Sequence, residues 1–276
     1  MPSLKSILKN KIPDNLLHLL PSSYDIIGDI VIFADFPKEL AKYERIISKI
    51  ILSHNKNIRV IAKKTKKYSG RYRLPKFKVI EGEKKLTTNF KENGCRFKID
   101  LEKCYFSPRL SNERKRIASL VKPNERVLVM FSGIGVYPIT IAKNSQAEEI
   151  LGVEINKSAH EYALENVKLN KANNVKLFLG DVKKIVPKFR RRFDRIIMPL
   201  PKGAKRYLPM AFSKIKKYGF IHFYDFERAD KFDRVVKKIE TSCKKAKKKF
   251  KVINLQKCGQ YAPRVFRVCV DCSIES

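Results

Sequence analysis

Short apolar runs alternate with amphipathic stretches throughout the second half of the chain, from about residue 118 onward. The apolar runs predict seven β-strands, at residues 126–131, 150–155, 175–180, 195–198, 219–224, 250–255 and 264–271. The clearest helix between them lies at 158–169. Strands that alternate with helices are typical of a parallel sheet covered on both faces. Because only residues 256–263 separate the last two strands, we expect these to form an antiparallel hairpin at one sheet edge.

The first half of the chain has a different pattern. It predicts helices at 4–20 and 38–52 and strands at 24–34, 58–62, 96–100 and 103–106. The segment 63–78 carries eight basic residues and no acidic one, with Tyr68, Tyr72 and Phe77 between them. We therefore expect an N-terminal α+β domain at residues 1–117. It is joined through residues 107–120 to a second domain at 118–276.

The charge of the chain narrows the choice of partners. Its 276 residues include 61 lysines and arginines against 27 aspartates and glutamates, which gives a formal net charge of +34. Such a surplus favours a polyanionic partner, and nucleic acid first. The alternative is a solvated lysine-rich surface that binds no polyanion.

Membrane and secreted classes are disfavoured by other features. The longest charge-free stretch, 127–142, is interrupted by Ser132, Gly133, Gly135 and Pro138, so we expect no membrane span. The N-terminus lacks the pattern of a signal peptide, and the six cysteines are scattered. We therefore expect a reducing, cytoplasmic location.

Three strand ends carry residues that suit an adenosine-containing ligand. Gly133 and Gly135 follow the first strand of the second domain, where small residues let a ligand approach the backbone and a helix N-terminus. Glu154, 19 residues past Gly135, ends the next strand and can accept hydrogen bonds from both ribose hydroxyls. Asp181, after the third strand, can accept from an adenine amino group. The alternative is that these are merely exposed strand ends.

Two adenosine-containing cofactors are candidates for a site at these three strand ends. NAD usually requires a third glycine, but Tyr137 and Pro138 stand where that small residue would be. S-adenosyl-L-methionine has no pyrophosphate and tolerates them. The terminal hairpin also fits a class I methyltransferase. We therefore expect an α/β, Rossmann-like, seven-stranded sheet with an antiparallel last strand, beside the N-terminal α+β domain.

Four separated motifs point to a family. The segments 20–30 (LPSSYDIIGDI), 92–94 (ENG), 105–114 (YFSPRLSNER) and 130–135 (MFSGIG) resemble the archaeal/eukaryotic tRNA (guanine-N1)-methyltransferase family. That family modifies guanosine 37, next to the anticodon, and includes relatives in wyosine synthesis. The resemblance runs from about Leu20 to the C-terminus. Many members begin with a small domain that contacts the tRNA elbow; here that contact is expected to be absent or replaced by the basic surface.

The resemblance implies a cofactor site and a catalytic set. The methyl donor would be lined by residues of the helix near residue 114 and of four strand ends: Arg114, Phe131, Gly133, Gly135, Glu154, Ile155, Asp181, Val182 and Pro199. Glu113 would take the guanine N1 proton, and Arg73 (or Arg71) would stabilise charge on O6. Tyr105 would lie against the donor or the target base. Methyl transfer to N1 needs a base near the protonated nitrogen and a cation near the oxygen on which negative charge develops.

Each catalytic assignment has a structural alternative. Glu113 stands at a helix start, with Ser111 or Asn112 as N-cap, where an acid favourably meets the helix dipole. Tyr105 falls in a predicted strand and could belong to the core. The arginines of the 63–78 segment could bind phosphates, a role that does not exclude catalysis.

One position departs from the family pattern. The family typically has Asn-Leu-Pro after the fourth strand, whereas this chain has Pro199-Leu200-Pro201, which removes an amide and a backbone donor. The proline variant resembles the branch that methylates C7 of the tricyclic wyosine precursor, alone or in addition to guanine N1. A third branch transfers the aminocarboxypropyl group, and no sequence feature favours it. A non-catalytic RNA-binding protein with this fold is the rival from another class.

The partner is expected to be the anticodon loop of tRNA, bound by a monomer. Segments 63–78, 183–195 and 244–251 would contact phosphates, and the target base would be splayed into the pocket. No metal is expected. Cys269 and Cys272 lie at i and i+3 of a predicted strand and so point to opposite faces, and His222 is expected to be a packing residue.

Overall fold

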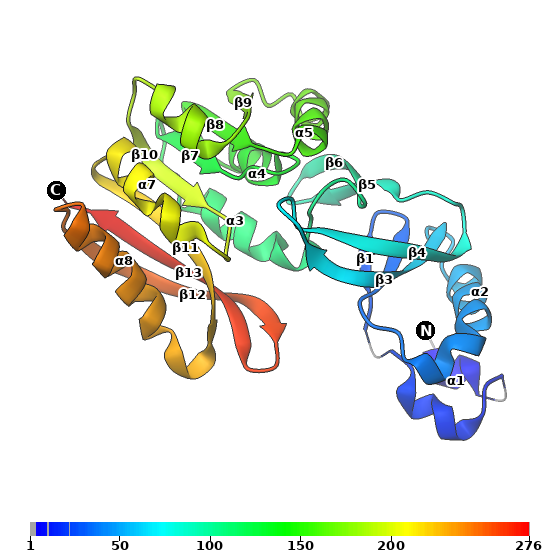
Figure 1. Cartoon of the computed structure of the whole chain (residues 1–276). Coiled ribbons are helices and arrows are strands. Elements are labelled where there is room, and N and C mark those ends of the chain that lie inside the picture. The colour runs from blue at the N-terminus through cyan, green and yellow to red at the C-terminus, as the bar shows by residue number, and fades with distance from the viewer. Residues whose placement is uncertain (1–3, 10, 22, 276) are drawn as a thin grey trace. The chain divides into compact units, whose positions relative to one another are not determined.

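The computed structural model describes residues 4–9, 11–21 and 23–275, so Ser22 of the first motif lies outside the described residues. The described chain divides into two compact units (Figure 1). The first runs to Lys91 and includes Arg96–Pro108; the second comprises Glu92–Cys95 and the chain from Arg109 onward. The helix that carries Glu113 therefore packs with the second unit. The division of the chain into separate domains at residues 1–117 and 118–276 stays a prediction.

A seven-stranded sheet forms the centre of the second unit. Its order is β12-β13-β11-β10-β7-β8-β9. The strands are β7 (Arg126–Met130), β8 (Glu149–Glu154), β9 (Val175–Leu179), β10 (Phe193–Met198), β11 (Ile215–Arg228), β12 (Phe250–Ala262) and β13 (Val265–Ile274). β13 pairs antiparallel with both β11 and β12, and the pairs from β11 through β9 are parallel. The expected α/β sheet, its terminal hairpin and its antiparallel last strand are confirmed.

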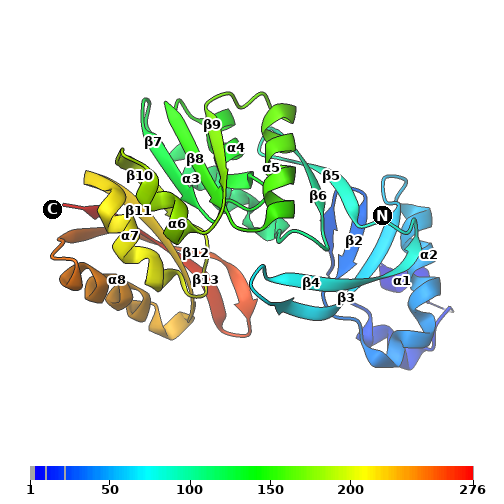
Figure 2. The same ribbon diagram turned by 45° about the horizontal axis from the view of Figure 1, so that its top comes forward.

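Helices cover both faces of this sheet (Figures 1 and 2). On one face lie α3 (Ser111–Ser119), α4 (Val136–Asn144) and α5 (Lys157–Leu169). On the other lie α6 (Val182–Ile185), α7 (Leu208–Lys214) and α8 (Asp233–Lys245). Short 3-10 turns connect these elements: η4 (Val186–Lys188), η5 (Ala204–Tyr207) and η6 (Ala229–Lys231).

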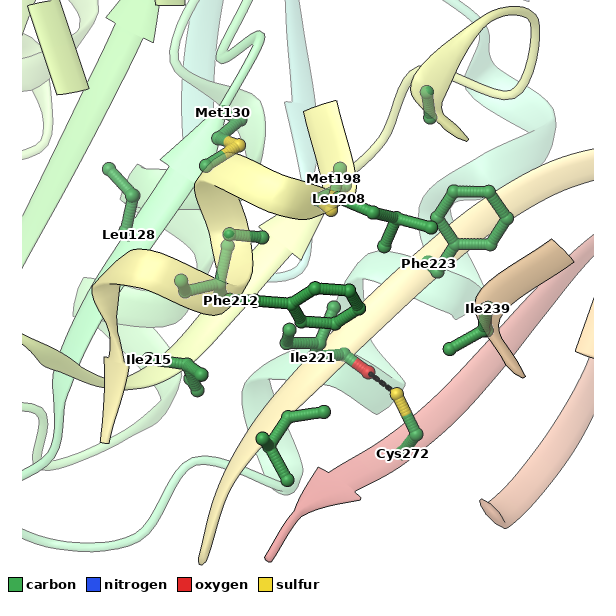
Figure 3. Close-up of a cluster of buried hydrophobic side chains, with 14 of the residues drawn as sticks. Leu128, Met130, Met198, Leu208, Phe212, Ile215, Ile221, Phe223, Ile239 and Cys272 are labelled. Atoms are coloured by element: carbon green, nitrogen blue, oxygen red, sulfur yellow. Dashed lines mark hydrogen bonds between the residues drawn. The ribbon is translucent and has the colours of Figure 1, made fainter. Parts of the chain in front are cut away.

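The core on the α7 and α8 side explains the alternation of the strands. Met198, Ile221, Phe223 and Cys272 point to this side and pack against apolar residues of both helices (Figure 3). The intervening strand residues point to the α3 side, because side chains alternate along a strand. Buried apolar side chains on both faces are what a sheet covered on both sides requires.

The first unit contains a four-stranded sheet, a separate hairpin and short helices. The sheet order is β1-β2-β3-β4. Its strands are β1 (Asp25–Ile27), β2 (Ile30–Phe33), β3 (Val60–Ser69) and β4 (Leu74–Gly82), and the separate hairpin is β5 (Thr87–Glu92) and β6 (Cys95–Asp100). The helices are α1 (Leu4–Leu8) and α2 (Glu44–His54), with the 3-10 turns η1 (Asp14–Leu19) and η2 (Lys38–Tyr43); η3 (Pro108–Leu110) spans the boundary between the units along the chain. Most of the basic segment 63–78 lies in the β3–β4 hairpin.

The strand predicted at 24–34 is wrong in one respect, because it is a hairpin of β1 and β2. The chain turns at Gly28, whose φ is +58°. A Cβ at this position would come within 2.1 Å of the Thr88 hydroxyl oxygen and 2.2 Å of the Asn89 carbonyl oxygen. Glycine is therefore required both for the turn and for the close approach of β5.

Two further elements of the first unit differ from the sequence prediction. The helix predicted at 4–20 is interrupted before η1, because Pro13 has an extended ψ of 138°. The strand predicted at 103–106, which includes Tyr105, is wrong. Asp100 ends β6 in a turn: its carboxylate accepts the Glu102 N–H at 2.9 Å and its carbonyl accepts the Cys104 N–H at 3.0 Å.

In the part of the chain that the structure describes, no helix is long and apolar enough to span a membrane.

Candidate functional site

The loop after β7 has an unusual backbone. Phe131, Gly133 and Gly135 have φ values of +64°, +57° and +84°, all in the left-handed region. A Cβ on Gly135 would come within 3.0 Å of the Ile139 side chain and 3.4 Å of Ala163 Cβ, so this glycine lets α4 and α5 pack closely. A Cβ on Gly133 would meet no atom within 4 Å. The loop therefore leaves open space beside Gly133, which a ligand can approach.

Glu154 is held at the end of β8 by three backbone N–H groups. Its Oε2 accepts from Gly133 at 2.8 Å, and its Oε1 accepts from Ile155 at 2.9 Å and from Asn156 at 2.8 Å. Burial raises the pKa of this carboxyl, against the opposing effect of the three N–H donors. Each carboxylate oxygen can accept more than one hydrogen bond, so the fixed group retains acceptor capacity for hydroxyls of a ligand.

The next strand end adds a second fixed carboxylate. The Gly180 N–H donates to the Glu154 carbonyl at 2.7 Å, which ties the end of β9 to that of β8. Asp181 follows and caps α6 by accepting the Lys183 N–H at 2.9 Å. Val182 is buried in the core below it. Among the predicted donor-site residues, Gly133, Glu154, Ile155 and Asp181 thus lie on one connected edge.

Pro199 stands at the end of β10 on the same edge of the sheet. β10 pairs with β7, and the Leu200 N–H donates to the Met198 carbonyl at 2.7 Å, which makes a tight turn around Pro199. The Phe131 and Tyr207 rings make a T-shaped contact, with centroids 4.9 Å apart. β7 and β10 are also where the strand order reverses, the place where open α/β sheets bind ligands.

Glu113 is the candidate base, and its surroundings differ from the expectation of a helix-terminus charge. It is 5% exposed. Its Oε1 accepts from the Tyr224 hydroxyl at 2.6 Å and from Arg116 NH2 at 2.8 Å, and its Oε2 accepts from Arg116 Nε at 2.7 Å. Arg114, on the same helix, forms a buried two-pronged ion pair with Glu92. The two neighbours on α3 therefore have different partners.

A line of polar groups, all buried except the partly exposed Arg116, extends from Glu113 across the sheet face that α3 covers. We call it the buried charge network, and it consists of Glu113, Arg116, Asp271, His222, Arg195 and Glu125. Arg116 NH1 donates to Asp271 Oδ2 at 2.6 Å, and His222 Nδ1 lies 2.5 Å from Asp271 Oδ1. Arg195 NH1 lies 2.7 Å from His222 Nε2 and its Nε donates to Glu125 at 2.7 Å. Positive and negative groups alternate, which lets the charges remain buried.

The protonation of His222 follows from its place in this network. Burial lowers the pKa of His222, against the opposing effect of Asp271, so the ring is neutral at neutral pH. Arg195 can only donate, so Nε2 is the acceptor and Nδ1–H donates to Asp271. His222 is thus a packing and hydrogen-bonding residue, in the place that the sequence predicted.

His222, Cys269 and Asp271 bring three possible metal ligands within 4.8 Å of one another. His222 Nδ1 and Asp271 Oδ1 are at hydrogen-bond distance, and the guanidinium of Arg116 contacts both Asp271 oxygens. Cys269 Sγ also lies 3.2 Å from Asp271 Oδ1. These contacts are those of a hydrogen-bonded cluster. Cys272 points to the opposite face and donates to the Ile221 carbonyl (Figure 3).

The remaining predicted residues belong to the first unit. Arg73 lies in the β3–β4 turn with φ +54°, and its N–H donates to the Gly70 carbonyl at 3.2 Å. Arg71 is exposed on the same turn, and Tyr105 is half-buried in the irregular segment after β6. Their roles toward donor and base stay predictions.

Sequence reasoning missed most of the buried charge network. Arg116 and Asp271 are 155 residues apart, and Tyr224 and Glu113 are 111 apart. A signal was nevertheless present, because His222 and Asp271 interrupt the short apolar runs at residues 220–224 and 268–272. A polar residue in a doubly covered strand requires a buried partner.

Comparisons with known proteins agree with this architecture. Residues 88–253 match the TRM5/TYW2 methyltransferase domain, and residues 4–85 match the TYW2 N-terminal domain. The chain is 39% identical to Trm5b of Pyrococcus abyssi, a tRNA (guanine(37)-N(1))-methyltransferase, over 94% of this chain and 77% of the relative. It is 36% identical to Taw22 of Nanoarchaeum equitans, a tRNA (guanine(37)-N(1))/4-demethylwyosine(37)-methyltransferase, over 79% and 88%. It is 34% identical to a tRNA(Phe) (4-demethylwyosine(37)-C(7)) aminocarboxypropyltransferase of Methanocaldococcus jannaschii, over 91% and 98%.

Solved structures of the same proteins and their relatives resemble this chain closely. The crystal structure of Pyrococcus abyssi Trm5b superposes with a TM-score of 0.86 at 37% identity, covering 96% of this chain and 78% of the other. A complex of aTrm5 with tRNALeu gives 0.85 at 30% identity, covering 99% and 78%. TYW2 of Pyrococcus horikoshii, in complex with MeSAdo, gives 0.83 at 25% identity, covering 99% and 98%. The domain match, the relatives and the strand order agree: this chain belongs to the TRM5/TYW2 methyltransferase family.

Proposed function

We propose that this protein is an S-adenosyl-L-methionine-dependent tRNA methyltransferase that acts on the purine at position 37. The observation that carries the proposal is the Glu154 carboxylate, fixed by three backbone N–H groups beside the open space at Gly133, in a chain of this family. Glu154 would accept from the ribose hydroxyls and Asp181 from the adenine amino group. Ile155 and Val182 would border the adenine, and Phe131, Gly135, Arg114 and Pro199 would complete the donor site.

The chemistry assigns Glu113 the role of base. In methylation at N1, the nitrogen lone pair attacks the methyl carbon, the carbon–sulfur bond breaks, and its electron pair neutralises the sulfonium. The N1 proton passes to Glu113, whose Oε2 accepts one hydrogen bond and so has a lone pair to spare. Arg73 or Arg71 would stabilise the charge on O6, and Tyr105 would lie against the donor or the base. The sulfonium already activates the methyl group, so this step needs no metal.

Pro199 bears on which atom is methylated. A prolyl side chain offers a guanine edge an apolar surface instead of an amide, so we propose C7 of the tricyclic wyosine precursor, guanine N1, or both as acceptors. The Nanoarchaeum equitans relative is named for methylation of both guanine 37 N1 and 4-demethylwyosine 37, which supports proposing both acceptors here.

A second candidate is transfer of the aminocarboxypropyl group from the same donor. It is favoured by the match of residues 4–85 to the TYW2 N-terminal domain and by the Methanocaldococcus jannaschii relative, of which 98% is covered. Methyl and aminocarboxypropyl transfer differ in which carbon on the sulfonium is attacked. The orientation of the donor at the strand ends therefore decides between them.

The substrate that fits the charge of +34 is tRNA, bound through its anticodon loop. The exposed basic turn of β3–β4 and the lysines around the end of α8 are proposed as phosphate contacts. A monomer suffices for this proposal, because the donor-site residues and Glu113 come from one unit of one chain.

The test uses purified protein, donor labelled either in its methyl or in its aminocarboxypropyl group, and two tRNAs. One carries unmodified guanosine 37 and the other the wyosine precursor; a tRNA with adenosine at position 37 is the control. Mass spectrometry of the nucleosides identifies the transferred group and the modified base. Methyl transfer to either substrate supports the main proposal, and aminocarboxypropyl transfer supports the second. If no group is transferred and calorimetry detects no donor binding, the result would favour a non-catalytic RNA-binding protein.

A further inference from the structure

Arg116 contacts two carboxylates at once. Its Nε and NH2 donate to Glu113, while NH1 donates to Asp271 Oδ2 at 2.6 Å and NH2 lies 3.3 Å from Asp271 Oδ1. A planar guanidinium can serve two carboxylates in this way, whereas an ammonium cannot hold both in fixed positions. One positive charge is thus shared between the proposed base and a second acid.

Asp271 is fixed from its other side. His222 Nδ1 lies 2.5 Å from its Oδ1, and Asn254 Nδ2 lies 3.4 Å from its Oδ2. The carboxylate is 4% exposed. Burial alone would raise the pKa of Asp271, but the hydrogen bond from His222 and the charge of Arg116 lower it well below its usual range. Asp271 therefore stays ionised and competes permanently with Glu113 for Arg116.

We propose that Arg116 and Asp271 are positioning residues that fix the orientation and the base strength of Glu113 in the methyl transfer. The inference rests on the proposed function. Arg116 alone against Glu113 would hold the carboxylate in a tight pair and make it a weak base. Because Asp271 binds the same guanidinium, Arg116 orients Glu113 without being paired with it alone.

Apart from the Arg114–Glu92 ion pair, the other groups that face Glu113 are neutral at neutral pH. Tyr224 on β11 and Tyr137 on α4 are buried, and burial raises the pKa of both phenols. Cys258 on β12 and Cys269 on β13 also have thiol pKa values raised by burial. Arg114, next to Glu113 on α3, is paired with Glu92. Arg116 and Asp271 are therefore the charges whose removal is expected to change the base strength of Glu113.

The two removals should act in opposite directions. Arg116→Gln takes away the positive charge, so Glu113 should protonate more readily, and the acid limb of the rate–pH profile should move up by about one pH unit or more. Asp271→Asn takes away the competing negative charge, so Glu113 should become a weaker base. The plateau rate should then fall about 3- to 10-fold, and the acid limb should not move up.

The experiment measures single-turnover methyl transfer to tRNA against pH for wild type, both variants, Arg116→Lys and the double variant. Donor and tRNA affinities are measured in parallel and should stay near wild type. Arg116→Lys keeps the positive charge, so the acid limb should stay at the wild-type pH. The rate should be lower, because the planar guanidinium that holds both carboxylates is lost. The double variant removes one charge of each sign, which guards against failure of a single variant to fold. Glu149→Gln, at the opposite end of β8, is the matched control for loss of a paired carboxylate.

Opposite effects of the two variants support the inference. A folded Arg116→Gln protein with the wild-type profile would overturn it, as would an Asp271→Asn protein whose acid limb moves up in the same way as that of Arg116→Gln. A wild-type protein that transfers no group to either tRNA would instead overturn the proposed function, and this inference with it.

Discussion

Glu154 and Glu113 are two carboxylates of one unit that are held in opposite ways. Glu154 accepts three hydrogen bonds from backbone N–H groups, so its partners carry partial charges and depend on no neighbouring side chain. Glu113 is held by the side chains of Arg116 and Tyr224. The first carboxylate lies beside open space at a strand end, and the second is buried between its own helix α3 and β11.

The difference separates binding from proton chemistry. Main-chain donors fix a carboxylate in place and leave it as an acceptor for a neutral ligand, which suits the ribose of the donor. Side-chain donors orient a carboxylate through groups of the same network, which suits a base that must point at one proton. Substitutions at Glu113, Asp271 and Glu154 can break or sharpen this division.

The largest effect is expected at Glu113. Glu113→Gln removes the group that takes the proton, so methyl transfer should fall about 10²- to 10⁴-fold, with donor affinity nearly unchanged. Carbon methylation should suffer less if proton loss follows its slow step. Rates are measured with saturating donor, and donor affinity by calorimetry. Full N1 activity in this variant would return Glu113 to a purely structural role in its pair with Arg116.

The free energy of unfolding should depend on pH in opposite ways for Asp271, which is held by side chains, and Glu154, which is held by backbone N–H groups. The pKa of Asp271 is lowered in the folded protein, so its contribution is present above the ordinary value of 3.8 and is lost as the pH falls further. Asp271→Asn should therefore lower the free energy of unfolding by about 3 kcal/mol at neutral pH, with the gap to wild type closing in acid.

Glu154 should show the reverse slope. Its pKa is raised above the ordinary 4.5, so folding is penalised as the pH rises through the raised value and the carboxyl ionises. Relative to Glu154→Gln, wild type should gain stability as the pH falls. Denaturant unfolding without donor, at several pH values, measures both slopes. Slopes of equal sign would contradict the contrast between the two environments.

Donor affinity should depend on Glu154 and not on Glu113. In Glu154→Gln an amide group replaces one oxygen and faces a backbone N–H, so the acceptor for the ribose is displaced. Hydrogen bonds to a charged group contribute about 1.5–3 kcal/mol, so donor affinity should fall about 10- to 100-fold. Calorimetry with donor alone measures it, with Glu149→Gln as control. Equal losses in Glu113→Gln and Glu154→Gln would break the separation of roles.

The smallest effect is expected at Pro199, outside both carboxylates. Pro199→Asn supplies an amide that can pair with the guanine edge, so the product ratio should shift a few-fold toward N1-methylguanosine, away from the tricyclic base. The ratio is read by mass spectrometry from a mixture of both tRNAs. An unchanged ratio would mean that target choice is made elsewhere.

The sheet of the second unit was predictable because its strands contain short apolar runs, of which β7, β8 and β10 are buried on both faces. The candidate donor site could be proposed from the same pattern, because Gly133, Glu154 and Asp181 stand at or just after the ends of three predicted strands. In the first unit, β5 was missed because Thr87–Glu92 is mostly polar and alternates between buried and exposed positions. Gly28 turned one apolar run into two strands, because a positive φ is invisible to hydrophobic periodicity.

The buried charge network could not be derived from local pattern. Its members come from α3, β10, β11, β13 and the loop before β7, and folding alone brings them together. Arg116 is within local reach of Glu113, three residues along the same helix, but no local pattern points to Asp271, 155 residues away, as the second partner of Arg116. Partner choice between distant charges is decided by strand order and by which face each residue occupies.

The shared guanidinium of Arg116 also has a consequence for how this sequence can drift over generations. A change at position 271 that removes the acid leaves His222 without its acceptor and gives Arg116 a single partner. A change at position 116 leaves two buried acids facing each other. Either substitution alone is costly, and both together are less so, because coupled neighbours are not additive. Positions 116, 222 and 271 should therefore be inherited as a set, and lineages that lose one should have lost or exchanged the others.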